Sequence, residues 1–399
     1  MYEGRDPISG KGIVFVNAAA PQSREPAAPQ QGIALCLSGG GYRATVFHAG
    51  ALIRLNEAGL LPKLSRISSV SGGSITAGVL GLLWRSFTFD EGVASNFGVF
   101  IDRIRAMADV TVDVGAVGGG LFFPGAISDR VAAAYDRILF SGATLQDLPD
   151  DTKGEGPRFV INATSVQTAD LWRFSRPYMG DYRVGLFDSP AVPLATAVAA
   201  SSAFPPLLSP LTLNLPQQVA PTPDADLSRA PFTTTAVLSD GGVYDNLGLE
   251  TAMKACTTIL VSDGGQKIAP EEDPHHDWPR HALRVLDVID NQVRSLRKRY
   301  LIEAYQRGDR TGGYWGIRTH FADYDLANDP LKCAQRDPTQ LADIPTRLEK
   351  MPRSMQDRLM NWGYAICDAA LRKHFDPALQ ARFGVTIADP EAFPFNGGY

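Results

Sequence analysis

The sequence contains few of the residues that hold small secreted or metal-binding domains together. Its 399 residues include only four cysteines, at positions 36, 256, 333 and 367. These lie far apart and form no Cys-x-x-Cys pair, so their spacing predicts neither a disulfide framework nor a zinc cage. Reduced thiols of this kind fit a cytoplasmic protein.

The sequence also lacks the segments that direct a chain into or across a membrane. It contains no run of roughly 18 apolar residues, the least that a spanning helix requires. Glu3 and Asp6 lie where a secretory signal would be basic. The net charge is −5 and no long basic block is present, which excludes a nucleic-acid partner. We therefore expect a cytoplasmic protein without a transmembrane segment, whose only membrane contact is peripheral.

The chain divides into three predicted regions. Residues 1–31 form an N-terminal extension and end in a linker rich in Pro, Ala and Gln. Residues 32–270 alternate between strand and helix patterns, which predicts an α/β domain with a mostly parallel sheet and helices on both faces. Residues 271–399 are mainly helical and are expected to pack on that domain. The strands are predicted at 33–37, 66–70, 159–163, 236–239 and 259–262, and the helices at 42–58, 75–84, 192–203, 247–255, 281–306 and 353–375.

A candidate nucleophile lies between a predicted strand and a predicted helix. The string Ser69-Val70-Ser71-Gly72-Gly73 resembles the G-x-S-x-G elbow, in which a sharp turn lifts a serine above the sheet. Ser69 replaces the first glycine of that pattern. The alternative is an ordinary helix N-cap at Ser71. In either case the positive end of the following helix points at the serine.

A second loop, Ser38-Gly39-Gly40-Gly41-Tyr42-Arg43, follows the first strand directly. Its three glycines allow several backbone N–H groups to point at one oxyanion. The P-loop pattern is absent, and the dinucleotide pattern fails because Ala44 stands where a glycine belongs. A tight structural turn is the remaining alternative. One crossover unit joins this loop to Ser71, so both loops should emerge at the same edge of the sheet.

Two aspartates are candidates for the general base. Asp240 and Asp263 each end a predicted strand and each precede two glycines, so spacing alone does not separate them. A buried carboxylate beside a serine hydroxyl acts as a base when burial raises its pKa. Five of the six histidines follow Asp240, so a Ser–Asp–His triad is also possible, although none of them lies in a recognisable loop motif.

Five blocks together resemble the patatin-like phospholipases, including the cytosolic phospholipases that share their dyad. They are the glycine loop 39–43, Ser71-Gly72-Gly73, the segment 199–206, Asp240-Gly241-Gly242, and its continuation to Asn246. The continuation follows Asp240 and not Asp263, which selects Asp240. The resemblance implies a three-layer α/β/α fold, a lipid substrate, acyl-ester hydrolysis by a Ser71–Asp240 dyad, and no metal or organic cofactor.

The resemblance also suggests roles for the neighbouring residues. Gly39, Gly40 and Gly41 form the oxyanion hole, helped by the backbone beside Ser71 at Gly72. Arg43 either binds a lipid phosphate or is a structural ion-pair partner. The chain itself adds the glycine-rich apolar stretch 115–124, which is either a mobile lid or lip that contacts acyl chains or a buried connection under the C-terminal helices. Alternative functions are a regulated membrane-damaging phospholipase effector, a lipid acyltransferase, a triad esterase and a non-catalytic ligand-binding protein.

Overall fold

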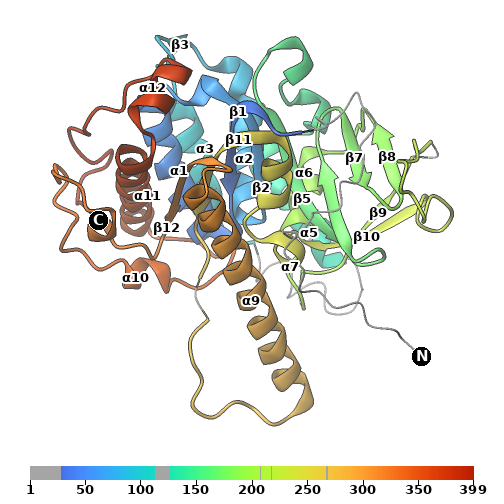
Figure 1. Ribbon diagram of the computed structural model, residues 1–399. Helices are drawn as coiled ribbons and strands as arrows, with labels where there is room; N and C mark the ends of the chain where they lie inside the picture. Colours follow the sequence, from blue (N-terminus) through green and yellow to red (C-terminus); the bar gives the residue numbers. More distant parts are fainter. Residues whose placement is uncertain (1–27, 113–125, 207, 217, 267) are drawn as a thin grey trace.

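The computed structural model describes residues 28–112, 126–206, 208–216, 218–266 and 268–399. The predicted apolar lip at 115–124 and most of the N-terminal extension lie outside these residues. The protein is a three-layer α/β/α structure around one central sheet, as the sequence predicted (Figure 1).

The central sheet is parallel in one half and antiparallel in the other. Its parallel part has the order β12-β11-β1-β2-β5, and β6, β7 and β8 continue it with antiparallel pairing. Strand β10 pairs antiparallel with both β5 and β9. The strands are β1 Gln30–Leu37, β2 Leu64–Val70, β5 Arg158–Ser165, β6 Asp170–Phe174, β7 Tyr178–Asp181, β8 Gly185–Asp188, β9 Leu211–Asn214, β10 Thr235–Asp240, β11 Cys256–Asp263 and β12 Thr311–Gly316.

Strand β1 shows why the sheet is covered on both faces. Its alternate residues Ile33, Leu35 and Leu37 belong to the larger hydrophobic cluster, whereas Ala34 and Cys36 belong to a second one. Because successive strand residues point to opposite faces, the continuous apolar run from Ile33 to Leu37 requires helices above and below it.

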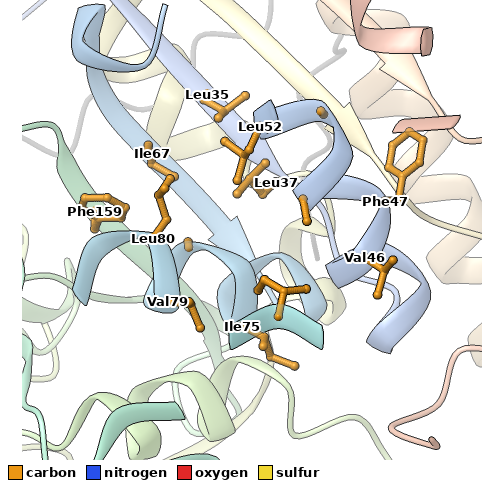
Figure 2. Close-up of a cluster of buried hydrophobic side chains, with 14 of the residues drawn as sticks. Leu35, Leu37, Val46, Phe47, Leu52, Ile67, Ile75, Val79, Leu80 and Phe159 are labelled. Atoms are coloured by element: carbon orange, nitrogen blue, oxygen red, sulfur yellow. The ribbon is translucent and has the colours of Figure 1, made fainter. Parts of the chain in front are cut away.

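Helices α1 (Gly41–Glu57) and α2 (Gly72–Leu83) cover the first face, and α3 (Gly98–Ala108), α6 (Leu194–Ser201) and α11 (Arg353–His374) pack beside them. Figure 2 shows side chains of α1 and α2 meeting those of β1, β2 and β5 in this cluster. Helix α8 (Leu249–Ala255) and the C-terminal end of α9 (Trp278–Gln306) cover the opposite face. The other strands and α-helices of the described residues are β3 Phe89–Asp90, β4 Val93–Ala94, α5 Ala126–Tyr135, α7 Gly242–Asp245, α10 Thr339–Ala342 and α12 Pro377–Phe383.

The C-terminal region was expected to be mainly helical, but it also adds a strand to the central sheet. Its strand β12 pairs with β11, which the sequence pattern did not predict because Gly312 and Gly313 interrupt the apolar run. Helix α11 lies against α1, and the buried pair Arg54–Asp368 joins the two helices at 2.9 Å.

Two glycines allow α1 and α11 to touch through their backbones. A Cβ added to Gly50 would lie 1.9 Å from the carbonyl oxygen of Met360, and one added to Gly363 would lie 2.0 Å from that of Phe47. The contact is reciprocal, so neither helix has room for a side chain at the crossing.

We predict that Gly50→Ala and Gly363→Ala each destabilise the protein by about 1–3 kcal/mol, because the added methyl must separate two buried helices. The loss should appear although alanine favours a helix over glycine by about 1 kcal/mol. The midpoint of urea unfolding measures it. Gly98→Ala is the matched control, since nothing lies within 4 Å of its added Cβ. Unchanged midpoints for both crossing variants would contradict the close contact.

Candidate active site

Ser71 and Asp240 lie side by side because β2 and β10 both pair with the same edge of β5 and run toward each other along it. Val70, the last residue of β2, pairs with Asn162, and Asp240, the last residue of β10, pairs with Ala163. Strand β6 occupies the other edge of β5 at these positions, so β2 and β10 share the remaining edge. They run in opposite directions and end at consecutive residues of β5, which brings Ser71 beside Asp240.

Ser71 occupies a strained turn between β2 and α2. Its φ is 51° and its ψ is −119°, a backbone conformation that non-glycine residues rarely adopt. Its backbone N–H donates to Ser201 Oγ at 2.9 Å, which helps to hold the turn. The side chain is 8% exposed and lies at the N-terminus of α2, where the partial positive charge of the helix stabilises an anion. These features match the predicted elbow.

A group of buried hydroxyls supports this turn and explains how Ser69 replaces a glycine. Ser74 Oγ lies 3.0 Å from Ser69 Oγ and 2.9 Å from Ser201 Oγ. Ser69 Oγ donates to the carbonyl of Val160 at 3.3 Å, and Ser201 Oγ donates to that of Asn162 at 2.6 Å. The extra hydroxyl is thus satisfied inside the core. Sequence reasoning did not identify Ser74 as a supporting residue, because only the fold brings it to Ser201.

Asp240 has the environment of a general base. It is 2% exposed, and the backbone N–H of Gly242 donates to its Oδ1 at 2.7 Å. Burial raises the pKa of Asp240 to about 7, although hydrogen bonds from Gly242 and from the Ser71 side chain oppose the rise; the negative charge of Asp290 adds to it. A carboxyl group with this pKa exchanges a proton readily near neutral pH.

Asp263 lies in a different environment. Tyr314 donates its hydroxyl to Oδ2 at 2.7 Å, Gly265 donates its N–H to Oδ1 at 2.9 Å, and Arg294 lies 4.0 Å from Oδ1. Burial alone would raise the pKa of Asp263, but Arg294 and these hydrogen bonds hold it below the ordinary value. Asp263 is therefore a fixed, charged partner of α9 and β12, and Asp240 is the aspartate beside the serine.

The glycine loop and the serine turn touch, as the crossover argument predicted. A Cβ on Gly72 would lie 2.2 Å from the carbonyl oxygen of Gly41. One on Gly39 would lie 3.2 Å from Ser71 Cβ and 2.3 Å from Asn246 Oδ1. Side chains at these glycines would force the two loops apart.

The structure changes the expected set of oxyanion donors. The N–H of Gly39 donates to the carbonyl of Asn246 at 3.1 Å, so Gly39 is not an available donor. Gly40 and Gly41 adopt φ values of 142° and 57°, which glycine permits. Within the described residues, the N–H groups of Gly40, Gly41 and Gly72 have no protein acceptor, and all three belong to the two touching loops.

The expectation that Arg43 binds a lipid phosphate does not fit the structure. The side chain is 1% exposed, its Nε donates to the carbonyl of Gly264 at 3.0 Å, and its Nη1 donates to that of Ile344. Burial lowers the pKa of Arg43 to about 10. The alternative expectation, a structural role for Arg43, agrees better with these contacts, although its partners are backbone carbonyls and not a carboxylate. Arg43 thus joins the glycine loop to the C-terminal region.

No histidine bonds to Ser71 or Asp240, and all six lie within the described residues. His48 is buried, with Nδ1 2.7 Å from Ser262 Oγ and Nε2 2.9 Å from the carbonyl of Ser38. Burial lowers the pKa of His48 to about 4, so its ring is neutral. His275, His276, His281 and His320 are exposed, and His374 packs on Tyr324. The geometry therefore favours a dyad over a triad.

The described part of the chain has neither a cluster of metal ligands nor a membrane-spanning helix. No group of three or more His, Cys, Asp or Glu side chains there could hold a metal ion. No helix there is both long and apolar enough to cross a bilayer.

Similarity to solved structures is distant. Human GIVD cytosolic phospholipase A2 is 13% identical, with a TM-score of 0.48, over 89% of this chain and 59% of that one. VipD from Legionella pneumophila is 14% identical, with a TM-score of 0.36, over 86% and 67% of the two chains. ExoU of Pseudomonas aeruginosa, solved with SpcU, is 15% identical, with a TM-score of 0.24, over 78% and 60%. The chain thus spans about three fifths of the length of the cytosolic phospholipase. No curated protein sequence matches it.

The sequence itself matches a family model over the segment that contains the site. Residues 35–253 fit the model for patatin-like phospholipases. This segment is more than half of the chain and includes the glycine loop, Ser71 and Asp240. The protein belongs to the patatin-like phospholipase family.

Proposed function

We propose that this protein hydrolyses acyl esters of lipids with a Ser71–Asp240 dyad. The observation that carries the proposal is the contact between a serine in a strained turn and a buried aspartate whose pKa is raised to about 7. Family membership supports a lipid ester as the substrate.

The reaction follows from these positions. Asp240 takes the hydroxyl proton while Ser71 Oγ attacks the acyl carbonyl, and the resulting oxyanion accepts hydrogen bonds from the N–H groups of Gly40, Gly41 and Gly72. The tetrahedral intermediate collapses to an acyl-enzyme, and the departing alkoxide takes the proton from Asp240. Water then attacks the acyl-enzyme, giving its proton to Asp240, and the fatty acid leaves as the Ser71 hydroxyl is restored.

Two alternatives use the same chemistry. If the hydroxyl of another lipid replaces water in the second step, the enzyme is an acyltransferase. A regulated membrane-damaging effector would catalyse the same reaction, but only after a signal or partner had activated it. Product mass spectrometry after incubation with mixed phospholipids and acylglycerols distinguishes free fatty acid from transferred acyl groups.

We predict that Ser71→Ala lowers hydrolysis of a short p-nitrophenyl ester by about 10³-fold or more, because the nucleophile is removed. Fluorophosphonate labelling should disappear as well, while circular dichroism stays unchanged. Ser65→Ala, an exposed serine on the same strand, is the control and should keep both readouts. Labelling that persists in Ser71→Ala would rule out this nucleophile, and an unlabelled wild type would favour a non-catalytic ligand-binding protein.

We predict that kcat/KM for the short ester rises with pH and reaches half its maximum near pH 7. The carboxylate form of Asp240 is the base, and protonation below its raised pKa removes it. Asp240→Asn should abolish this rise and lower kcat/KM by about 10³-fold or more. Asp263→Asn should retain the pH profile. If Asp263→Asn is instead the inactive variant, the base has been assigned wrongly.

The two aspartates should also have opposite effects on stability. Because the folded pKa of Asp240 lies above its unfolded value, its proton is held more tightly when folded, and its contribution to stability falls as the pH rises from about 4 through 7. The lowered pKa of Asp263 has the reverse effect, stabilising the fold above the unfolded pKa and losing that effect in acid. At pH 8 we expect Asp240→Asn to raise the thermal unfolding midpoint and Asp263→Asn to lower it. Equal shifts would contradict the difference in environment.

A further inference from the structure

Helix α9 leaves many large apolar side chains in solvent. Trp278 is 81% exposed, and Leu283, Val285, Leu286, Val288, Ile289 and Leu296 are between 41% and 55% exposed. Only Leu301 and Ala304, near the C-terminal end, are buried. Figure 1 shows the helix extending from the body of the protein, with that end against the sheet. Soluble proteins rarely expose so much contiguous apolar surface without a partner.

Most of these side chains share one face of α9. Trp278, Val285, Ile289 and Leu296 are separated by seven, four and seven residues, which places them in a line along a helix, and Leu286 borders that line. We call these five residues the apolar stripe. Trp278 is at the N-terminus, the end farthest from the sheet, where an indole can insert between lipid headgroups and acyl chains.

The charge of α9 differs in sign from that of the whole chain. The helix carries six Arg or Lys and three Asp or Glu, a net charge of +3, in a chain whose net charge is −5. In the exposed half of α9, Arg280 and Arg284 pair with Asp277 and Glu271. Lys298 and Arg299 lie nearer the sheet, are exposed, and form no ion pair among the described residues. An apolar stripe with exposed cations on the same helix is typical of helices that lie in an anionic membrane interface.

Helix α9 is also fixed to the loop that carries the candidate base. Arg297 donates to the carbonyl of Tyr244 at 3.1 Å and lies 3.6 Å from Asp245 Oδ1, both within a few residues of Asp240. On the same helix, Arg294 donates to the carbonyl of Gln266 at 2.8 Å. The exposed half of α9 therefore extends from the candidate active site.

We propose that the apolar stripe of α9 docks the protein on anionic lipid surfaces and presents the candidate active site to the membrane. This proposal rests on the proposed function for the choice of a lipid surface as the occupant. Charge complementarity favours the same choice, since Lys298 and Arg299 are exposed cations that anionic headgroups would attract, whereas the same cations on a second copy of α9 would repel them.

The test uses the full chain with Ser71→Ala, so that turnover does not consume the vesicles. Flotation is measured with vesicles of phosphatidylcholine alone and of equimolar phosphatidylcholine and phosphatidylglycerol. We expect binding to the anionic vesicles that weakens at high salt. Adding Trp278→Ser, Leu286→Ser and Ile289→Ser should reduce this binding by about tenfold or more, because three apolar anchors are lost.

The matched control is Val99→Ser with Val166→Ser, two exposed valines outside α9, and it should bind vesicles as the parent does. Thermal unfolding and light scattering of both variants report folding and oligomeric state. Unchanged vesicle binding by the triple variant would overturn the proposal. A dimeric parent protein and a monomeric triple variant would overturn it as well, because the apolar stripe would then bind a second copy of the chain. If the protein binds vesicles but fluorophosphonate does not label Ser71 of the wild type, the docking proposal stands and the dyad is rejected. If Ser71 is labelled but the protein does not bind vesicles, only the docking proposal is rejected.

Discussion

The site depends on the pairing of three strands at two consecutive residues. Asn162 of β5 ends the parallel pairing with β2, and Ala163 begins the antiparallel pairing with β10. Strands β2 and β10, which are far apart in the sequence, therefore run in opposite directions and end at neighbouring residues of β5. A register shift of one residue would turn the side chains of either strand to the other face of the sheet. The position of Ser71 relative to Asp240 is thus set by the backbone hydrogen bonding of β5, before any contact between their side chains.

This arrangement buries the carboxyl group of Asp240, where its negative charge is less stable than in water. Asp240 is buried, and its raised pKa expresses the free-energy cost of ionising it there. The residues around it are held by short hydrogen bonds and close backbone contacts. The hydroxyls of Ser69, Ser74 and Ser201 fix the serine turn, and glycines bring the neighbouring loops within backbone contact. The strain at Ser71 and the burial of Asp240 are both features that a fold retains only when its surroundings determine them.

The C-terminal region contributes to the same constraint. Arg43 holds the glycine loop against the carbonyls of Gly264 and Ile344, so the loop that faces Ser71 is supported from outside the family segment. Strand β12 extends the sheet, and α11 meets α1 through paired glycines. Helix α9 fixes Asp263 and Asp245 at one end and extends its apolar stripe into solvent at the other. The region thus supports the candidate active site and carries the surface that we propose binds lipid.

Local patterns in the sequence determined much of this. The alternation of strand and helix patterns predicted β1, β2, β5, β10 and β11. The crossover between β1 and β2 predicted that the glycine loop meets Ser71, because parallel strands end at one edge. Only the tertiary structure decided the rest. The continuation to Asn246 selected Asp240 over Asp263 by resemblance alone, and the structure supplied the physical difference in their surroundings. The N–H of Gly39 is used by Asn246, and Arg43 is buried by a segment about 300 residues away. Burial and hydrogen-bond partners depend on residues distant in sequence, and a local pattern holds no information about them.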